Sequence, residues 1–218
     1  MLEMKGIKKG YGKKILYSDF DLTIEPGEFV VLGGKSGCGK TTLLNMIGSL
    51  EKPDAGTITY NGKDIFSRGY QRKYLQSDVS FLFQNFALVE NKTVRQNLAL
   101  VQKKQQSDYT MESALEFVGL TDVLNQKVYQ LSGGEQQRVA MARVLMKKSS
   151  LVLADEPTGS LDKENADNII RLLKELNKQG KTIIMVTHME EYRNAGSRFL
   201  NIEADAGKID ICLLPNSY

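Results

Sequence analysis

The amino-acid sequence predicts an α/β fold, with a mainly parallel sheet, a peripheral antiparallel β subdomain and an inserted helical subdomain. Continuous apolar runs separated by helical stretches are typical of parallel strands that helices cover on both faces. A glycine-rich loop with a lysine joins one apolar strand to a helix, and the first part of the chain is rich in short β-forming segments. Together these features predict a layered core with additions at its edge.

Length and composition indicate one domain that stays inside the cell. A chain of 218 residues can bury a full core, which we expect at residues 1–84 and 149–218, with the helical subdomain at 85–148. The net charge of +3 comes without a basic block, so we expect no nucleic-acid partner. Cys38 and Cys212 are far apart and indicate neither a disulfide nor a metal site. With no secretion signal and no apolar run near the roughly 20 residues of a membrane span, we expect a cytoplasmic protein.

The first part of the chain predicts antiparallel strands. The segments from Leu2 to Leu32 and from Thr57 to Ile65 are short and β-leaning. Within the second segment, "YNGK" places Asn61 and Gly62 at a tight turn, and this pair favours a two-residue hairpin. We therefore expect these segments to form a peripheral antiparallel sheet.

Three apolar runs in the rest of the sequence predict parallel strands: "VSFLF" (Val79–Phe83), "LVLAD" (Leu151–Asp155) and "TIIMVT" (Thr182–Thr187). Because the runs are continuous rather than alternating, both faces of each strand are expected to be buried. The stretch between Gln84 and Lys148 has a mainly helical pattern. We interpret it as an insertion into the core.

The stretch "FVVLGGKSGCGKTTLL" has the form of a phosphate-binding loop, with an apolar strand before it and a helix after it. Gly34, Gly37 and Gly39 allow successive backbone N–H groups to face a β-phosphate. Lys40 would reach the β- and γ-phosphate oxygens, and Thr41 would offer its hydroxyl to Mg²⁺. A glycine-rich turn with a chance lysine is the alternative, but loop, lysine, hydroxyl and flanking elements coincide here.

Cys38 lies inside this loop, at a helix N-terminus beside Lys40, a setting that makes thiols reactive. The loop needs only the backbone N–H of residue 38, so the thiol need not have a function. Because of its position we nevertheless expect the thiol to be reactive, so that alkylating agents inactivate the protein and ATP protects it.

Two carboxylates follow the apolar run in "SLVLADEPTGSLD". Asp155 and Glu156 stand at the strand end, where Pro157 removes a hydrogen-bond donor and is expected to hold Glu156 extended. In phosphate-loop enzymes, such an Asp holds Mg²⁺, and a neighbouring carboxylate orients or deprotonates the attacking water. An acidic strand end that caps the next helix is the alternative.

Three further residues have both a structural and a functional interpretation. His188, the only histidine, follows the third apolar run, and Gln84 follows the first. Because parallel strands align their carboxyl ends, His188 can lie near Glu156 and the γ-phosphate, and Gln84 near Mg²⁺ or the attacking water. Tyr11 is either an exposed turn residue or an aromatic platform for adenine.

In this order and spacing, "GKSGCGKT", Gln84, "LSGGEQQR", "LVLADEPTGSLD" and His188 resemble the nucleotide-binding domain of an ATP-binding cassette (ABC) protein over almost the whole chain. The resemblance implies that Tyr11 stacks on adenine, that Gln84 senses a transmembrane partner and that Asp162 lies in the turn linking two active sites. It also implies that His188 contacts the γ-phosphate and that Glu156 is the catalytic carboxylate. Lys35 stands where this family often has proline.

The candidate site residues form three groups, for which the resemblance implies ATP and Mg²⁺ as ligands. The catalytic group is Glu156, His188, Gln84 and Lys40; the Mg²⁺ group is Thr41, Gln84 and Asp155; and the nucleotide-binding group is Tyr11, Gly34, Lys35, Ser36, Gly37, Cys38, Gly39, Lys40, Thr41, Thr42, Ser132, Gly133, Gly134 and Asp162.

The stretch "QLSGGEQQRVAMARVL" offers a second anion site, because Ser132, Gly133 and Gly134 open a helix. The helical insertion is expected to carry Ser132 away from the sheet edge at which the loop with Lys40 opens. In the family that the sequence resembles, two domains pack head to tail, and the Ser-Gly-Gly of one closes on the ATP of the other. We therefore expect an ATP-dependent dimer, and a homodimer satisfies this exchange.

The resemblance also implies a separate membrane permease and a place on the inner face of the membrane. Docking is expected between Gln84 and Val94, where Phe86, Leu88 and Val89 offer apolar contacts; packing within the insertion's own core is the alternative. The short single-domain form with "EPTGSLD" is similar to the macrolide-efflux, lipoprotein-release and bacteriocin-export branch. This similarity implies export or extrusion of a peptide, lipoprotein or drug.

Two other function classes stay open. Non-transport ABC ATPases act on DNA or ribosomes, but usually carry a coiled-coil insertion, zinc-binding cysteines or two cassettes, none of which this sequence has. A nucleotide-dependent regulatory switch without turnover is opposed by the presence of Lys40, Gln84, Glu156 and His188 together.

Overall fold

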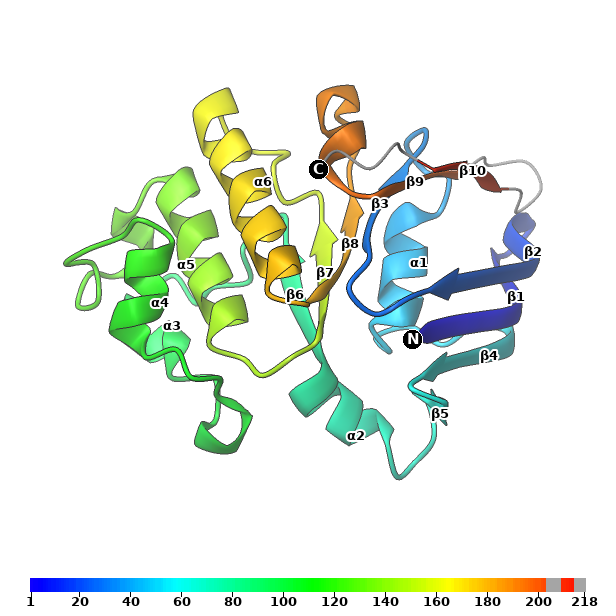
Figure 1. Ribbon diagram of the computed structural model, residues 1–218, viewed down its shortest axis with the longest axis horizontal. Helices are drawn as coiled ribbons and strands as arrows, with labels where there is room; N and C mark the ends of the chain where they lie inside the picture. The colour runs from blue at the N-terminus through cyan, green and yellow to red at the C-terminus, as the bar shows by residue number, and fades with distance from the viewer. Residues whose placement is uncertain (203–208, 214–218) are drawn as a thin grey trace.

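The structure, a computed structural model, has three layers (Figure 1). A central sheet has helix α1 (Lys40–Ile47) and a second sheet on one side, and helices α5 (Gly133–Leu145) and α6 (Lys163–Lys178) on the other. The predicted α/β class, with its parallel sheet, antiparallel subdomain and helical insertion, is confirmed.

The structure describes residues 1–202 and the backbone of residues 209–213. The parts of the predicted core at residues 203–208 and 214–218 lie outside the described residues. Within the described part, no helix has both the length and the apolar character that crossing a bilayer requires.

The central sheet has the strand order β10-β9-β3-β8-β7-β6. Its neighbouring strands are parallel, except that β10 runs antiparallel to β9. The strands are β3 (Phe29–Gly33), β6 (Val79–Phe83), β7 (Leu151–Asp155), β8 (Thr182–Val186), β9 (Arg198–Ile202) and β10 (Ile209–Leu213). Strands β6, β7 and β8 match the three predicted apolar runs to within one residue.

Both faces of the central sheet are buried, which explains why its strands are continuously apolar. Phe29 and Val31 of β3 belong to the hydrophobic cluster that contains α5 and α6, whereas Val30 and Leu32 belong to the cluster that contains α1 and the second sheet. Side chains alternate between the two faces of a strand. A strand covered on both faces therefore has no position that favours a polar residue.

The second sheet is antiparallel, with the order β2-β1-β4-β5. Its strands are β1 (Leu2–Tyr11), β2 (Lys14–Ile24), β4 (Ala55–Tyr60) and β5 (Lys63–Asp64). Asn61 and Gly62 join β4 to β5 with φ angles of 49° and 73°. Positive φ at both central residues is what a type I′ hairpin turn requires, so the predicted Asn-Gly hairpin is confirmed.

The prediction that residues 2–32 form antiparallel strands is wrong for the last strand, β3. Strand β3 pairs in parallel with β8 and β9 at the centre of the other sheet. All five of its residues are buried, so β3 has the pattern of a strand covered on both faces. Position in the chain suggested the wrong sheet, whereas the apolar pattern indicated the right one.

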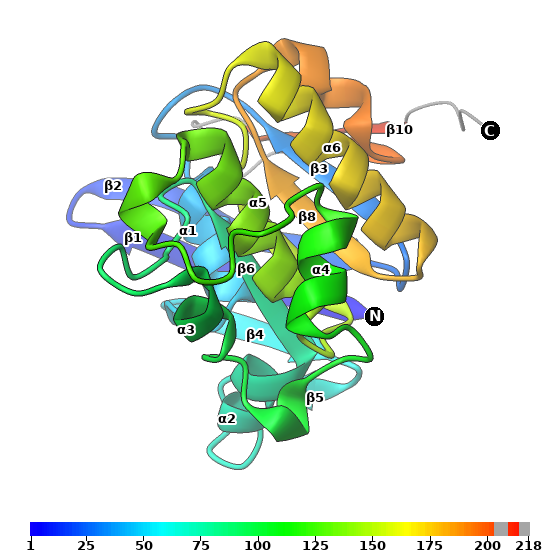
Figure 2. The same cartoon turned by 90° about the vertical axis from the view of Figure 1, so that its left-hand side faces the viewer.

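The helical subdomain groups α3, α4 and α5 beside the edge strand β6 (Figures 1 and 2). Capping boxes at Thr93 and Thr110 begin α3 and α4. The remaining helical elements of the described chain are α2 (Gln71–Lys73), a π-helical turn (Tyr74–Asp78), α3 (Val94–Leu98), α4 (Met111–Phe117) and 3₁₀ turns at Lys103–Gln105, Val128–Gln130 and Glu190–Ala195.

A glycine allows α1, the helix that follows the phosphate-binding loop, to pack closely on the central sheet. Gly48 ends α1 with an ordinary φ of −73°. A Cβ atom built on Gly48 would lie 2.4 Å from Phe81 Cζ of β6 and 3.2 Å from Leu153 Cδ1 of β7. This close approach fixes the end of α1 against the strand that delivers Asp155.

Replacing Gly48 with alanine should lower the free energy of unfolding by about 1–3 kcal/mol, because the extra methyl group overpacks the contact with Phe81. Gly69→Ala is the matched control, since no atom lies within 4 Å of a Cβ built on Gly69. Its effect should stay within about 0.5 kcal/mol. Urea denaturation followed by circular dichroism measures both variants. Equal stabilities would contradict the close packing at Gly48.

Candidate functional site

The loop between β3 and α1 has the backbone shape of a phosphate-binding loop. Gly34, Gly37 and Gly39 have φ angles of 133°, 74° and 107°, which residues with a Cβ rarely adopt. At Gly34 a built Cβ would also lie 2.4 Å from the carbonyl oxygen of Ile202. Helix α1 begins at Lys40 without a side-chain cap, so its first backbone N–H groups can bind an anion.

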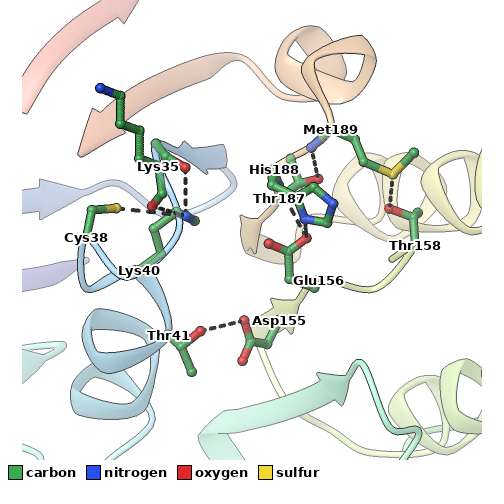
Figure 3. A network of polar contacts seen from close by, with 11 residues as sticks. Lys35, Cys38, Lys40, Thr41, Asp155, Glu156, Thr158, Thr187, His188 and Met189 are labelled. Carbon is green, nitrogen blue, oxygen red and sulfur yellow. Dashed lines mark hydrogen bonds and ion pairs between the residues drawn. The ribbon is translucent and has the colours of Figure 1, made fainter. Parts of the chain in front are cut away.

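The Lys40 side chain is held inside this loop. It is buried, and its Nζ donates hydrogen bonds to the carbonyl oxygens of Gly34 at 2.8 Å and Lys35 at 3.0 Å (Figure 3). Both partners are neutral. The positive charge of Lys40 is therefore placed to stabilise phosphate oxygens bound by the same loop.

Thr41 and Asp155 place two oxygen atoms that can bind a metal ion close together at the start of α1. The Thr41 hydroxyl donates to Asp155 Oδ1 at 3.3 Å. Burial raises the pKa of the Asp155 carboxyl, and the hydrogen bond from Thr41 opposes this shift. A hydroxyl and a carboxylate are ligands that Mg²⁺ prefers, so the pair fits the predicted role.

Glu156 and His188 face one another at the ends of β7 and β8. Glu156 Oε2 lies 2.8 Å from His188 Nδ1 and accepts a hydrogen bond from the His188 backbone N–H at 3.3 Å. The expected extended conformation of Glu156 is wrong, because its φ is 47°. The chain leaves the strand at this left-handed residue, and this turn aims the side chain at His188. Figure 3 shows the pair across from the phosphate-binding loop.

A cavity of about 570 Å³ lies between this loop and the end of β1. Tyr11 borders it; its ring is half exposed and its hydroxyl donates to Glu51. Residues from separate segments of the chain share the cavity: Tyr11, Lys14, Leu16, Ser36, Gly37, Gly39, Lys40, Thr41, Thr42, Glu156 and His188. The cavity thus joins a candidate adenine platform to the phosphate-binding loop and the catalytic candidates.

Lys35 and Cys38 lie differently from the other loop residues. Lys35 is exposed, points away from Lys40 in Figure 3, and borders a neighbouring cavity of about 540 Å³. Cys38 is fully buried in the cluster that contains α1. Rapid alkylation needs an accessible thiol, and in this structure the Cys38 side chain is not accessible.

The structure does not bring Gln84 into the cavity. Its side chain is exposed at the end of β6, and its Nε2 lies 3.3 Å from a Cβ built on Gly159. Gln84 therefore lies beside the segment that follows Glu156. Its predicted contacts with Mg²⁺ and the attacking water stay predictions.

Ser132, Gly133 and Gly134 also lie outside the residues that line the cavity. Ser132 caps α5: its hydroxyl accepts from the Glu135 backbone N–H at 3.3 Å and donates to Glu135 Oε2 at 2.8 Å. In Figure 1, α5 lies on the side of the central sheet opposite to α1. The chain thus keeps its two candidate phosphate sites on separate helices and separate faces.

Asn165, near the start of α6, contacts residues of α5. Its backbone N–H donates to Asp162, which caps α6, at 2.9 Å. Arg138 of α5 donates to its side-chain oxygen, and a Cβ built on Gly134 would lie 2.4 Å from that oxygen. Asp162 is therefore linked to the Ser-Gly-Gly segment by a short chain of contacts.

Sequence reasoning missed Lys14 and Asn165. Lys14 lines the cavity and donates to the Gly37 carbonyl oxygen at 2.8 Å. The sequence feature that could have identified Lys14 is its position, three residues after the candidate adenine platform, Tyr11. For Asn165, the sequence shows only that it lies three residues after the helix cap Asp162. This spacing does not identify Arg138 of α5 as its partner.

Comparison with known proteins gives the family of this chain. The family model described as ABC transporter matches residues 17–159. The lipoprotein-releasing system ATP-binding protein LolD 1 of Chlorobium luteolum is 37% identical, with 97% of each chain covered. The macrolide export ATP-binding/permease protein MacB of Marinobacter nauticus is 36% identical, and the alignment covers 93% of this chain but 33% of that longer protein.

A solved structure has the same fold. The ATP-binding cassette MJ0796, seen as a dimer in a post-hydrolysis state bound to ADP and Pi, is 32% identical and superposes with a TM-score of 0.82 over 97% of this chain and 98% of that one. The phosphate-binding loop, the paired carboxylates and the Ser-Gly-Gly helix thus occur in a chain that belongs to the ABC transporter family, as an ATP-binding and ATP-hydrolysing subunit.

Proposed function

We propose that two copies of this subunit pair head to tail around two ATP molecules and drive a separate membrane permease. The observation that carries the pairing is the position of Ser132–Gly134, which opens a helix but does not line the chain's own cavity. A two-fold pair lets each copy supply this segment to the other. The dimeric state of the MJ0796 cassette bound to ADP and Pi supports a pairing of two copies.

In the proposed reaction, Glu156 accepts a proton from the water that attacks the γ-phosphate. Its carboxylate is held by both the ring and the backbone of His188, and the ring is the proposed contact to the γ-phosphate. Thr41 and Asp155, with Gln84, would hold Mg²⁺, which when bound neutralises phosphate charge. Lys40 adds a fixed positive charge where negative charge develops.

Hydrolysis would then open the dimer. The γ-phosphate is the group that Ser132 and Gly134 of the other copy contact in this proposal, and ADP lacks it. A ligand shifts a conformational equilibrium only through its different affinity for the two states. Loss of this contact would therefore destabilise the closed dimer. In this way ATP hydrolysis would be coupled to a conformational change.

The permease would dock close to Gln84–Val94, which places the subunit on the inner face of the membrane. Phe86 and Leu88 pack partly against the core of the helical subdomain, so they favour the structural interpretation, whereas Val89 is exposed. Beside this segment, a groove of about 240 Å³ is lined by Phe83, Leu100, Arg143 and Lys147, among others. The lining combines apolar side chains with Arg143 and Lys147, and the proposed occupant is a short helix of a membrane partner.

The proposed cargo class is a peptide, lipoprotein or drug that is exported or extruded. The support is the similarity to LolD, part of a lipoprotein-releasing system, and to MacB, a macrolide export protein. The MacB chain also combines ATP-binding and permease parts. By analogy, the proposed partner of this ATP-binding subunit is a membrane permease.

Glu156→Gln should keep ATP binding, lower ATP turnover by about 10²-fold or more because the base is lost, and give an ATP-dependent dimer. Phosphate release and size-exclusion chromatography with light scattering measure the two effects. Glu175→Gln, which removes a partly exposed carboxylate from the far part of α6, should behave as the wild type. A Glu156→Gln protein that stays monomeric with ATP and still hydrolyses it would contradict the assignment.

Lys40→Ala should weaken ADP and ATP binding and lower turnover by about 10²-fold, because a positioned phosphate donor is removed. Calorimetric titration with ADP measures the affinity, and thermal unfolding checks that the loop still folds. The control is Lys178→Ala on the exposed end of α6. Unchanged nucleotide affinity in Lys40→Ala would refute the role of this lysine.

Leu100→Asp should weaken copurification with a membrane protein and leave the ATPase activity of the isolated subunit unchanged, because Leu100 lines the groove and not the cavity. Leu50→Asp is a matched control: Leu50 is 53% exposed and Leu100 is 52% exposed. If both substitutions have the same effect on copurification, the groove is not the docking site.

A further inference from the structure

A second lysine reaches the phosphate-binding loop from the antiparallel sheet. Lys14 begins β2, is exposed, and lines the same cavity as Tyr11 and Lys40. Its Nζ donates to the Gly37 carbonyl oxygen at 2.8 Å, and a Cβ built on Gly37 would lie 3.7 Å from this nitrogen. The ammonium group is thus held in direct contact with the loop that binds phosphates.

Lys14 and Lys9, which lies on the neighbouring strand, differ in the groups that surround their ammonium nitrogens. Lys9 pairs with Glu51 at 2.9 Å and with Asp54 at 3.4 Å, and Glu51 also accepts from the Tyr11 hydroxyl. The acidic residues near this end of the sheet are therefore engaged with other donors. Lys14, within the described residues, has a neutral carbonyl as its hydrogen-bond partner.

Lys14 lies between the candidate adenine platform, Tyr11, and the phosphate-binding loop. Tyr11 and Lys14 are direct partners across the β1–β2 pair. An adenine stacked on Tyr11 has its sugar and first phosphate on the way to the loop, where backbone N–H groups and Lys40 take the β- and γ-phosphates. The Lys14 ammonium borders this intermediate stretch, because it touches both the cavity and Gly37.

We infer that Lys14 is a nucleotide-binding residue that pairs with the phosphate group next to the ribose. A charged acceptor makes a stronger hydrogen bond than a neutral carbonyl, and the flexible lysine side chain can exchange one for the other without moving the strand. The inference rests on the proposed nucleotide site and adds to it a cation supplied by the antiparallel subdomain.

The test compares Lys14→Met with Lys13→Met, which removes the neighbouring exposed lysine of the same turn; Lys13 does not line the cavity. Calorimetric titration of the full chain with ADP and Mg²⁺ at low and high salt is the measurement. Lys14→Met should weaken ADP about tenfold at low salt, with a smaller loss at high salt, because one ion pair is removed and ion pairs are screened. Lys13→Met should stay within about twofold of the wild type, and Lys14→Arg should restore most of the affinity.

Three outcomes separate the possibilities. Equal ADP affinities of Lys14→Met and Lys13→Met would overturn the inference while leaving the nucleotide site intact. A loss in Lys14→Met that is the same at low and high salt would also overturn it, since it would mean that Lys14 only supports the loop through Gly37. Failure of the wild-type chain to bind ADP would instead refute the proposed nucleotide site itself.

Discussion

Parallel pairing of β3, β8 and β7 is the constraint on which the site depends. In this register Leu32 lies beside Val186, and Val186 lies beside Asp155. The next residues along each strand are therefore the start of the phosphate-binding loop, the segment with His188, and Glu156. Segments that are more than a hundred residues apart in the sequence meet at one sheet edge because backbone hydrogen bonds fix their relative heights. A slip by one residue would move Glu156 away from His188 and reverse the faces of every strand residue.

Burial of both sheet faces makes this register secure, and it also determines where the remaining functional groups lie. One face is covered by α1, so the phosphate-binding loop is anchored by the same packing that buries Leu32 and Val186. The other face is covered by α5 and α6, and α5 carries Ser132–Gly134. Because the central sheet separates α1 from α5, the two helices could contribute to one phosphate site, as proposed, only if they come from two molecules. The layer architecture thus favours a dimer for a physical reason.

The sequence predicted those parts of the molecule that depend on local pattern. The apolar runs gave β6, β7 and β8, and the Asn61–Gly62 pair gave a hairpin, because burial on two faces and positive φ restrict which residues fit. The sheet to which β3 belongs was not predicted by its place in the chain, since strand pairing is a tertiary property. The left-handed Glu156 was missed because the rule for residues before proline describes an average preference, which the contacts with His188 override here. Cys38 was expected to be reactive because it lies in the loop beside Lys40, but its side chain is buried in the cluster that contains α1, and sequence alone does not tell which side of a loop a side chain takes.

The hydrogen bonds inside the loop explain how one site can bind phosphate tightly and still release it. Lys40 donates to the carbonyl oxygens of Gly34 and Lys35, and Glu156 holds the His188 ring. In the proposed site, a phosphate oxygen would compete with these contacts, so where it displaces one, binding would gain only the difference between the charged acceptor and the acceptor that it displaces. A hydrogen bond that includes a charged phosphate is roughly twice as strong as a neutral one, so this difference favours binding without making it irreversible. In the proposed cycle, loss of the γ-phosphate would let the exposed His188 ring return to its contact with Glu156. In the proposed cycle, the hydrogen-bond donors of the site would have partners both with and without the γ-phosphate. The free-energy difference between the two states would then be small, as repeated cycles of ATP hydrolysis require.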